Sequence, residues 1–209
     1  MMTLPDKHEL DIMHLENLFQ FVDTRDHIEF LKPAGKTHYK LLAFLSTQFD
    51  GVEIFDIGTW HGSSAVALSM NPNNTIYSFD VLAQRQCEHT PFNVAFLIGD
   101  ILDENSETHE TYWKRLLKSP FICFDIHDKN GVHTGVPEIA FHKALVKDGY
   151  MGTVFYDDIH LTEGMKTFWN EVDRLKKDLT AIGHGAWGAG TGLVRYDTLV
   201  NGRPCNWVD

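Results

Sequence analysis

The sequence predicts an α/β protein with a doubly wound, mostly parallel seven-stranded sheet that ends in an antiparallel hairpin. Short apolar runs alternate with helical runs through most of the chain, the pattern of parallel strands joined by right-handed crossovers. The last two strand-like runs have no helix between them, so we expect them to pair as a hairpin. A glycine-rich turn joins the first strand to its helix. We expect residues 1–209 to form a single domain.

The elements follow from apolar periodicity and turn residues. Residues 1–34 are expected to form a helical N-terminal extension, with a helix over 8–22. Further helices are expected over 37–48, 63–69, 107–117, 137–146 and 163–177. The five parallel strands are expected at 52–57, 76–80, 94–100, 121–124 and 153–156, and the hairpin strands at 179–183 and 192–196.

Charge and composition exclude several function classes. The net charge is −11 and the basic residues are scattered, which argues against nucleic acid and against an anionic membrane surface as partners. A small-molecule substrate fits better, and a homo-oligomer is left open. There is no apolar run of transmembrane length and no signal peptide, and the three cysteines are far apart, so we expect a cytoplasmic protein.

The loop after the first strand indicates the kind of cofactor. Gly58 and Gly62 are spaced G-x-x-x-G, unlike the G-x-G-x-x-G of dinucleotide sites, and no lysine follows Gly62 to pair with a phosphate. Asp56 precedes the loop, so the site suits a cofactor that carries a cation. S-adenosylmethionine, with a sulfonium and an ammonium group, is such a cofactor. The alternative is an ordinary strand-to-helix turn.

Acidic residues stand in or after all five expected parallel strands. Because ligands of such sheets bind at the carboxyl ends of the strands, these carboxylates should gather at one edge. Asp80 would accept hydrogen bonds from ribose hydroxyls, Asp100 would lie beside the adenine, and Asp56 would lie nearer the amino end of the cofactor. Each acid is also a good turn or cap residue, which is the alternative interpretation.

Asp125, Asp157 and Asp158 form a second set, after the fourth and fifth strands. Converging carboxylates repel each other unless a cation neutralises them. Oxygen ligands of this kind suit Mg²⁺, Ca²⁺ or Mn²⁺. We therefore expect a divalent cation, with Mg²⁺ as the first choice.

These motifs resemble those of known enzymes. Asp56 to Ser64 resembles the first motif of class I methyltransferases, D/E-x-G-x-x-x-G-x-S, which implies a Rossmann-like methyltransferase fold. By that resemblance, Gly58 and Gly62 permit close approach of S-adenosylmethionine, and Ser64 bonds its methionine carboxylate. The loop and the later acids look like the metal-dependent catechol O-methyltransferases, and the Asp157-Asp158 region looks like the sugar O-methyltransferases of macrolide biosynthesis.

The resemblance implies metal ligands at Asp125, Asp157 and Asp158, where the catechol family has Asn at the last of these positions. It departs at Asp128, where that family places a lysine that serves as base. His127, two residues after Asp125, is our candidate catalytic base, and a loop histidine without a role is the alternative.

The sequence therefore favours an S-adenosylmethionine-dependent methyltransferase, specifically a divalent-metal-dependent O-methyltransferase that acts on a small-molecule hydroxyl. One alternative is a metal-independent methyltransferase on the same fold, in which Asp157 and Asp158 are caps. A second is a His/Asp metal enzyme, an oxygenase or hydrolase, whose ligands come from the set Asp125, His127, His133 and His160. A catalytically silent binding subunit is a third.

Overall fold

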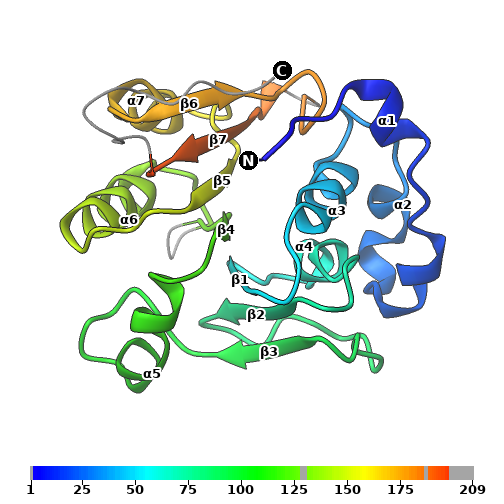
Figure 1. Ribbon diagram of the computed structural model, residues 1–209, viewed down its shortest axis with the longest axis horizontal. Coiled ribbons are helices and arrows are strands. Elements are labelled where there is room, and N and C mark those ends of the chain that lie inside the picture. The colour runs from blue at the N-terminus through cyan, green and yellow to red at the C-terminus, as the bar shows by residue number, and fades with distance from the viewer. Residues whose placement is uncertain (1, 128–130, 186–187, 198–209) are drawn as a thin grey trace.

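A single seven-stranded sheet runs through the molecule (Figure 1), and the computed structural model describes residues 2–127, 131–185 and 188–197. The strand order is β3-β2-β1-β4-β5-β7-β6, with β7 antiparallel to both of its neighbours. The strands are β1 Glu53–Ile57, β2 Thr75–Asp80, β3 Val94–Ile98, β4 Phe121–Phe124, β5 Thr153–Asp157, β6 Leu175–Asp178 and β7 Thr191–Arg195. The predicted doubly wound, mostly parallel sheet with a C-terminal antiparallel hairpin is confirmed.

Helices cover both faces of the sheet (Figure 1). On one face lie α3 Tyr39–Thr47 and α4 Ser63–Leu68, with the short helices α1 Lys7–Asp11 and α2 His27–Phe30 and the 3-10 turns η1 Glu16–Phe21 and η2 Thr24–Asp26 outside them. On the other face lie α5 Glu107–Leu116, α6 Val136–Lys147 and α7 Glu163–Glu171. The crossover helices change face between β1 and β4, and this switch point is where such sheets form their ligand crevice.

Alternation along the strands builds two apolar cores, one on each face. In β1, Ile54 packs with the α3 and α4 side, whereas Phe55 and Ile57 pack with the side of α5, α6 and α7. Both faces of a parallel strand are covered, so its residues are buried on both sides and the run is nearly all apolar. Of the two charged residues in β1, Glu53 is half-buried at the start of the strand, whereas Asp56 is fully buried, and its burial needs an explanation from the site.

The helix expected over 8–22 is wrong, because the chain forms α1 and then η1 with a break between them. The backbone oxygen of Asp11 would accept the Leu15 N–H in a continuous helix, but it accepts the ammonium of Lys40 at 2.9 Å. The carboxylate of Asp11 also accepts the Ala34 N–H at 2.9 Å. These long-range contacts fix the chain in a turn at this point.

The end of the expected helix 163–177 and the first hairpin strand are also wrong. Helix α7 ends at Glu171, and β6 occupies 175–178 in place of 179–183. Lys176 donates to the backbone oxygens of Trp169, Asn170 and Val172, so it caps the helix from the following strand. As an edge strand with only β7 for a neighbour, β6 tolerates the charged run Lys176-Lys177-Asp178, which reads as helix in the sequence.

Among the described residues, none of the helices has both the length and the apolar character needed to cross a membrane.

Candidate functional site

A cavity of about 790 Å³ opens at the carboxyl ends of the parallel strands. Its walls come from the ends of β1 to β5 and the loops that follow them, and from His184 in the loop between β6 and β7. Asp26 before α2 and His38 and Tyr39 at the start of α3 complete the walls. Eight of the predicted site residues line it: Gly58, Ser64, Asp80, Asp100, Asp125, His127, Asp157 and Asp158. Among the residues described, Asp56 and Gly62 are the predicted site residues that do not.

Asp56 is 1% exposed inside the strand β1, behind the cavity wall. One carboxylate oxygen accepts the hydroxyl groups of Ser64 (3.0 Å) and Ser78 (2.6 Å), and the other oxygen has no hydrogen-bond partner. Burial raises the pKa of Asp56 to about 6 against these hydrogen bonds. The Ser64 hydroxyl, expected to bond a cofactor carboxylate, here fixes the glycine loop onto β1.

The two glycines of the loop are needed for packing within the chain. Gly58 has φ +100°, and a Cβ there would lie 1.8 Å from the backbone oxygen of Asp125. Gly62 has φ +92°, and a Cβ there would lie 2.9 Å from side-chain atoms of Arg85 and Phe96. Any other residue at Gly58 would push apart the ends of β1 and β4, where the site forms.

Asp80 and Asp100 face the cavity and also hold their own loops. Asp80 accepts the N–H groups of Trp60 (2.8 Å) and Leu82 (3.0 Å), and so links the ends of β1 and β2. Asp100 accepts the N–H groups of Leu102 (2.8 Å) and Asp103 (3.2 Å). The turn role that the sequence left as an alternative is thus present. A carboxylate has about four acceptor positions, so these bonds leave capacity for a ligand.

The three predicted metal ligands fall into two groups, each of which includes at least one histidine: Asp157 is in one group, and Asp125 and Asp158 are in the other. Asp157, 4% exposed, has Oδ2 at 2.8 Å from His38 Nδ1 and 3.3 Å from His184 Nδ1. Burial disfavours its charge, but the two histidines outweigh burial and hold the pKa of Asp157 well below its usual range. For His38, burial lowers the pKa, but the combined attraction of Asp157, Asp125 and Asp158 outweighs burial and raises the pKa to about 9.

Asp125, His133 and Asp158 make up the second group, with one potential ligand atom of each within 4.8 Å of the others. His133 Nε2 lies 3.2 Å from Asp158 Oδ2. Burial and the charges of Asp157 and Asp125 raise the pKa of Asp158 to about 8, and burial with repulsion from Asp157 also raises the pKa of Asp125. Asp158 has φ +59°, a strained value for a residue with a side chain, and such strain is common at functional sites.

His127 is exposed at the cavity wall, between two rings. Its imidazole meets the edge of Trp60 at a centroid distance of 5.4 Å and that of His133 at 5.9 Å. His160, named in the oxygenase or hydrolase alternative, does not line the cavity, and its Nε2 lies 2.7 Å from Asp178 Oδ2. Asp128, where the catechol family has its lysine, lies outside the described residues.

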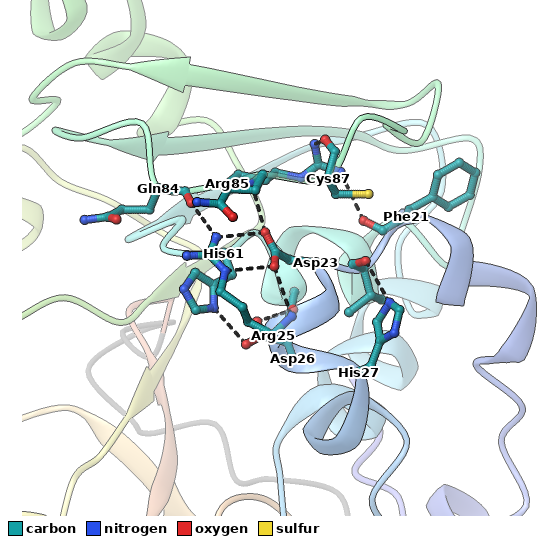
Figure 2. A network of polar contacts seen from close by, with 12 residues as sticks. Phe21, Asp23, Arg25, Asp26, His27, His61, Gln84, Arg85 and Cys87 are labelled. Carbon is teal, nitrogen blue, oxygen red and sulfur yellow. Dashed lines mark hydrogen bonds and ion pairs between the residues drawn. The ribbon is translucent and has the colours of Figure 1, made fainter.

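The N-terminal segment reaches the cavity through a polar network (Figure 2). Asp26 accepts a hydrogen bond from the Ser63 hydroxyl at 2.6 Å and lies 2.8 Å from His61 Nδ1. It therefore holds the N-terminal segment against the glycine loop. Arg25 donates to Asp23 and to the backbone oxygen of Gln84, and it so ties η2 to the loop after β2. The sequence assigned no site residue to this segment.

Sequence reasoning missed Asp26, His38, His61 and His184 as site residues. The one signal available was the count of twelve histidines, which is high for this length. Their positions are too scattered along the chain for any ligand spacing to show, and only the fold brings them to the carboxyl ends of the strands.

No protein-family model and no curated protein matches this chain. Solved structures do match. A cofactor-bound protein from MTB, Rv0187, gives a TM-score of 0.53 at 13% identity, over 76% of this chain and 79% of that one. Fibrillarin from Aeropyrum pernix with bound S-adenosyl-L-methionine gives a TM-score of 0.48 at 15% identity, over 74% of this chain and 73% of that one. Precorrin-6y C5,15-methyltransferase from Geobacter metallireducens gives a TM-score of 0.46 at 13% identity, over 67% of this chain and 72% of that one. At these identities the likeness shows the fold alone.

The burial of Asp56 predicts a pH-dependent stability. Because its folded pKa, about 6, lies above the usual 3.8, the folded state holds the proton longer than the unfolded state, and stability is lost as pH rises through this range. Asp56→Asn keeps an acceptor for Ser64 and Ser78 and removes the ionisation. The free energy of unfolding of the variant, measured with urea, should rise relative to that of the wild type by about 1.4 kcal/mol as the pH goes from 5 to 8. Asp50→Asn, at an exposed position, should show no such rise in the free energy of unfolding. An equal rise in both variants would contradict the assignment of the pH dependence to Asp56.

Proposed function

We propose that this protein is an S-adenosylmethionine-dependent methyltransferase that methylates a hydroxyl group of a small molecule with the help of a divalent cation. One observation carries the proposal. A single cavity brings the glycine loop and the acids Asp80 and Asp100 to one side, and the acid and histidine group of Asp125, His133 and Asp158 to the other. Its volume is in the range of roughly 300–1,000 Å³ that is usual for small-molecule sites.

The cofactor half of the cavity is formed by the ends of β1, β2 and β3. S-adenosylmethionine would supply an electrophilic methyl group on its sulfonium. Asp80 is placed after β2, where carboxylates of doubly wound folds accept ribose hydroxyls, and Asp100 follows the next strand outward. The indole of Trp60, 48% exposed, offers an aromatic surface beside them. The negative charge of this half suits a cationic cofactor better than a pyrophosphate.

The metal half fits a divalent cation, although with a changed ligand set. Burial, together with the charges of Asp157 and Asp125, raises the pKa of Asp158, and a cation would offset the repulsion among these carboxylates. In the proposed set, His133 joins Asp125 and Asp158 in place of Asp157, because these three residues bring potential ligand atoms close together. Mixed carboxylate and imidazole ligands suit Mn²⁺ at least as well as Mg²⁺. When bound, the cation would supply Lewis acidity that lowers the pKa of a substrate hydroxyl.

His127 is proposed as the group that removes the hydroxyl proton. S-adenosylmethionine would supply the methyl group when bound, and the substrate hydroxyl would then have to lose its proton to a base at this wall of the cavity. His127 follows Asp125 by two residues and faces the cavity beside Trp60 and His133. Asp128 would be a weak base in the position of the family's lysine.

Binding of the cofactor is the first test. The purified protein should bind S-adenosylmethionine and S-adenosylhomocysteine in a calorimeter, and Asp80→Ala should weaken both by about 1.5–3 kcal/mol, the value of a hydrogen bond to a charged group. Asp50→Ala removes an exposed carboxylate at the other end of β1 and should change nothing. Heat from NAD with none from either methionine derivative would exclude this cofactor.

Dependence on a divalent cation is the second test. In a screen of small hydroxyl compounds, turnover should vanish in excess chelator and return with Mn²⁺ or Mg²⁺. Asp125→Asn should lose turnover and keep affinity for the cofactor, because Asp125 lies on the far side of the cavity from Asp80 and Asp100. Unchanged turnover in chelator would instead favour the metal-independent methyltransferase.

The role of His127 is the third test. Removing a general base lowers kcat by roughly 10²–10⁴-fold, so His127→Ala should fall in this range with cofactor affinity intact. His14→Ala, which removes an exposed imidazole from the N-terminal segment, is the control. If kcat of His127→Ala equals that of the control, the cation and solvent hydroxide suffice and His127 is not the base.

A further inference from the structure

Beside the proposed cation site lies a second group of potential ligands, His38, Asp157 and His184, to which the methyltransferase proposal assigns no role. One ligand atom of each lies within 4.8 Å of the other two. His38 precedes α3, Asp157 ends β5, and His184 lies in the loop between β6 and β7. We propose that these three residues bind a divalent transition-metal ion that prefers imidazole, of the Zn²⁺ or Co²⁺ kind, in a site distinct from Asp125, His133 and Asp158.

The burial of His38 and the contact of its Nδ1 with Asp157 point to a ligand. The residue is 7% exposed, and its Nδ1 has no hydrogen-bond partner although Asp157 Oδ2 is only 2.8 Å away. The two atoms therefore form a close, buried ion pair without the geometry of a hydrogen bond. Buried polar atoms in native structures are nearly always hydrogen-bonded, so a close pair outside that geometry needs an explanation. A metal ion between the nitrogen and the carboxylate supplies one.

The distances agree with a metal centre. Ligand atoms about 2.1 Å from a metal, at angles between those of an octahedron and a tetrahedron, lie about 3.0–3.4 Å apart. Asp157 Oδ2 lies 2.8 Å from His38 Nδ1 and 3.3 Å from His184 Nδ1, which is close to that range. The two histidines each offer a ligand atom within 4.8 Å of the other, so they would move closer together around a bound ion. Two imidazoles and one carboxylate leave further positions open and favour Zn²⁺, Co²⁺ or Fe²⁺ over Mg²⁺.

The residues behind the ligands hold them in place. Thr191 donates its hydroxyl to Asp157 Oδ1 at 2.8 Å, which leaves Oδ2 to face both histidines. The same Thr191 oxygen accepts the backbone N–H of His184 at 2.9 Å, so one residue orients two ligands. Metal ligands are commonly oriented by a shell of this kind. Since the ligands come from three separate segments, a bound ion would also cross-link the N-terminal region to β5 and the β6–β7 loop.

Metal titration of the full chain tests the site without any need for turnover. After chelator treatment and dialysis, Zn²⁺ would be titrated in a calorimeter and Co²⁺ followed by its visible absorption. His38→Gln and His184→Gln should each lose this binding, at least about 100-fold in affinity. Thr191→Val should weaken it by about 10–100-fold, the usual effect of removing a group that orients a ligand. The wild type should also gain thermal stability with Zn²⁺, and the two glutamine variants should not.

Controls separate this site from its neighbour. His61→Gln removes an imidazole from the same cavity, bonded to Asp26, and should keep both the Zn²⁺ affinity and the Co²⁺ spectrum. Asp125→Asn and His133→Gln should keep them as well, even if the methyltransferase proposal fails. The inference is overturned if the wild type takes up neither ion, or if His38→Gln and His184→Gln bind as tightly as His61→Gln. It is also overturned if Asp125→Asn and not His38→Gln abolishes the binding.

Discussion

The repulsion among Asp125, Asp157 and Asp158 is the constraint around which this end of the sheet is arranged. Parallel pairing of β4 and β5 puts all three at one edge, where burial weakens solvation of their charges. Histidine side chains reduce this repulsion: His38 and His184 lie beside Asp157, and His133 lies beside Asp158. Only Asp157 is well compensated, since its pKa falls while those of Asp125 and Asp158 rise. The remaining negative charge is what makes a cation site chemically reasonable here.

Backbone conformation brings these groups close together. Gly58 lets the end of β1 pass against the backbone of Asp125, which no larger residue would permit. Asp158 takes a left-handed conformation directly after Asp157. Asp157 lies beside His38 and His184, whereas Asp158 lies 3.2 Å from His133 and 3.8 Å from His184. Each feature carries some local cost, and in both cases the surrounding sheet enforces it. The same edge of the sheet therefore brings together both groups of potential metal ligands.

The N-terminal segment is part of the cavity. Its polar network with the loops after β1 and β2 (Figure 2) holds Asp26 against the glycine loop, and the chain then continues to His38 at the start of α3. Apolar contacts of Leu10, Leu18 and Phe30 fix the segment onto α3 and α4. A segment anchored in this way adds Asp26 and His38 to the cavity wall, two side chains that the strand-end pattern does not supply.

The sequence by itself determined the sheet, its hairpin and the row of acids at the strand ends, because local periodicity and turn residues encode them. It placed β6 wrongly, since a charged edge strand looks like helix, and it ran the first helix through a break made by Lys40 and Ala34. Only the tertiary structure decided that Asp56 faces serines inside the core and that Asp157 pairs with His38 and His184. These partners lie far apart in the chain, and contacts of that range leave no spacing for a sequence to show.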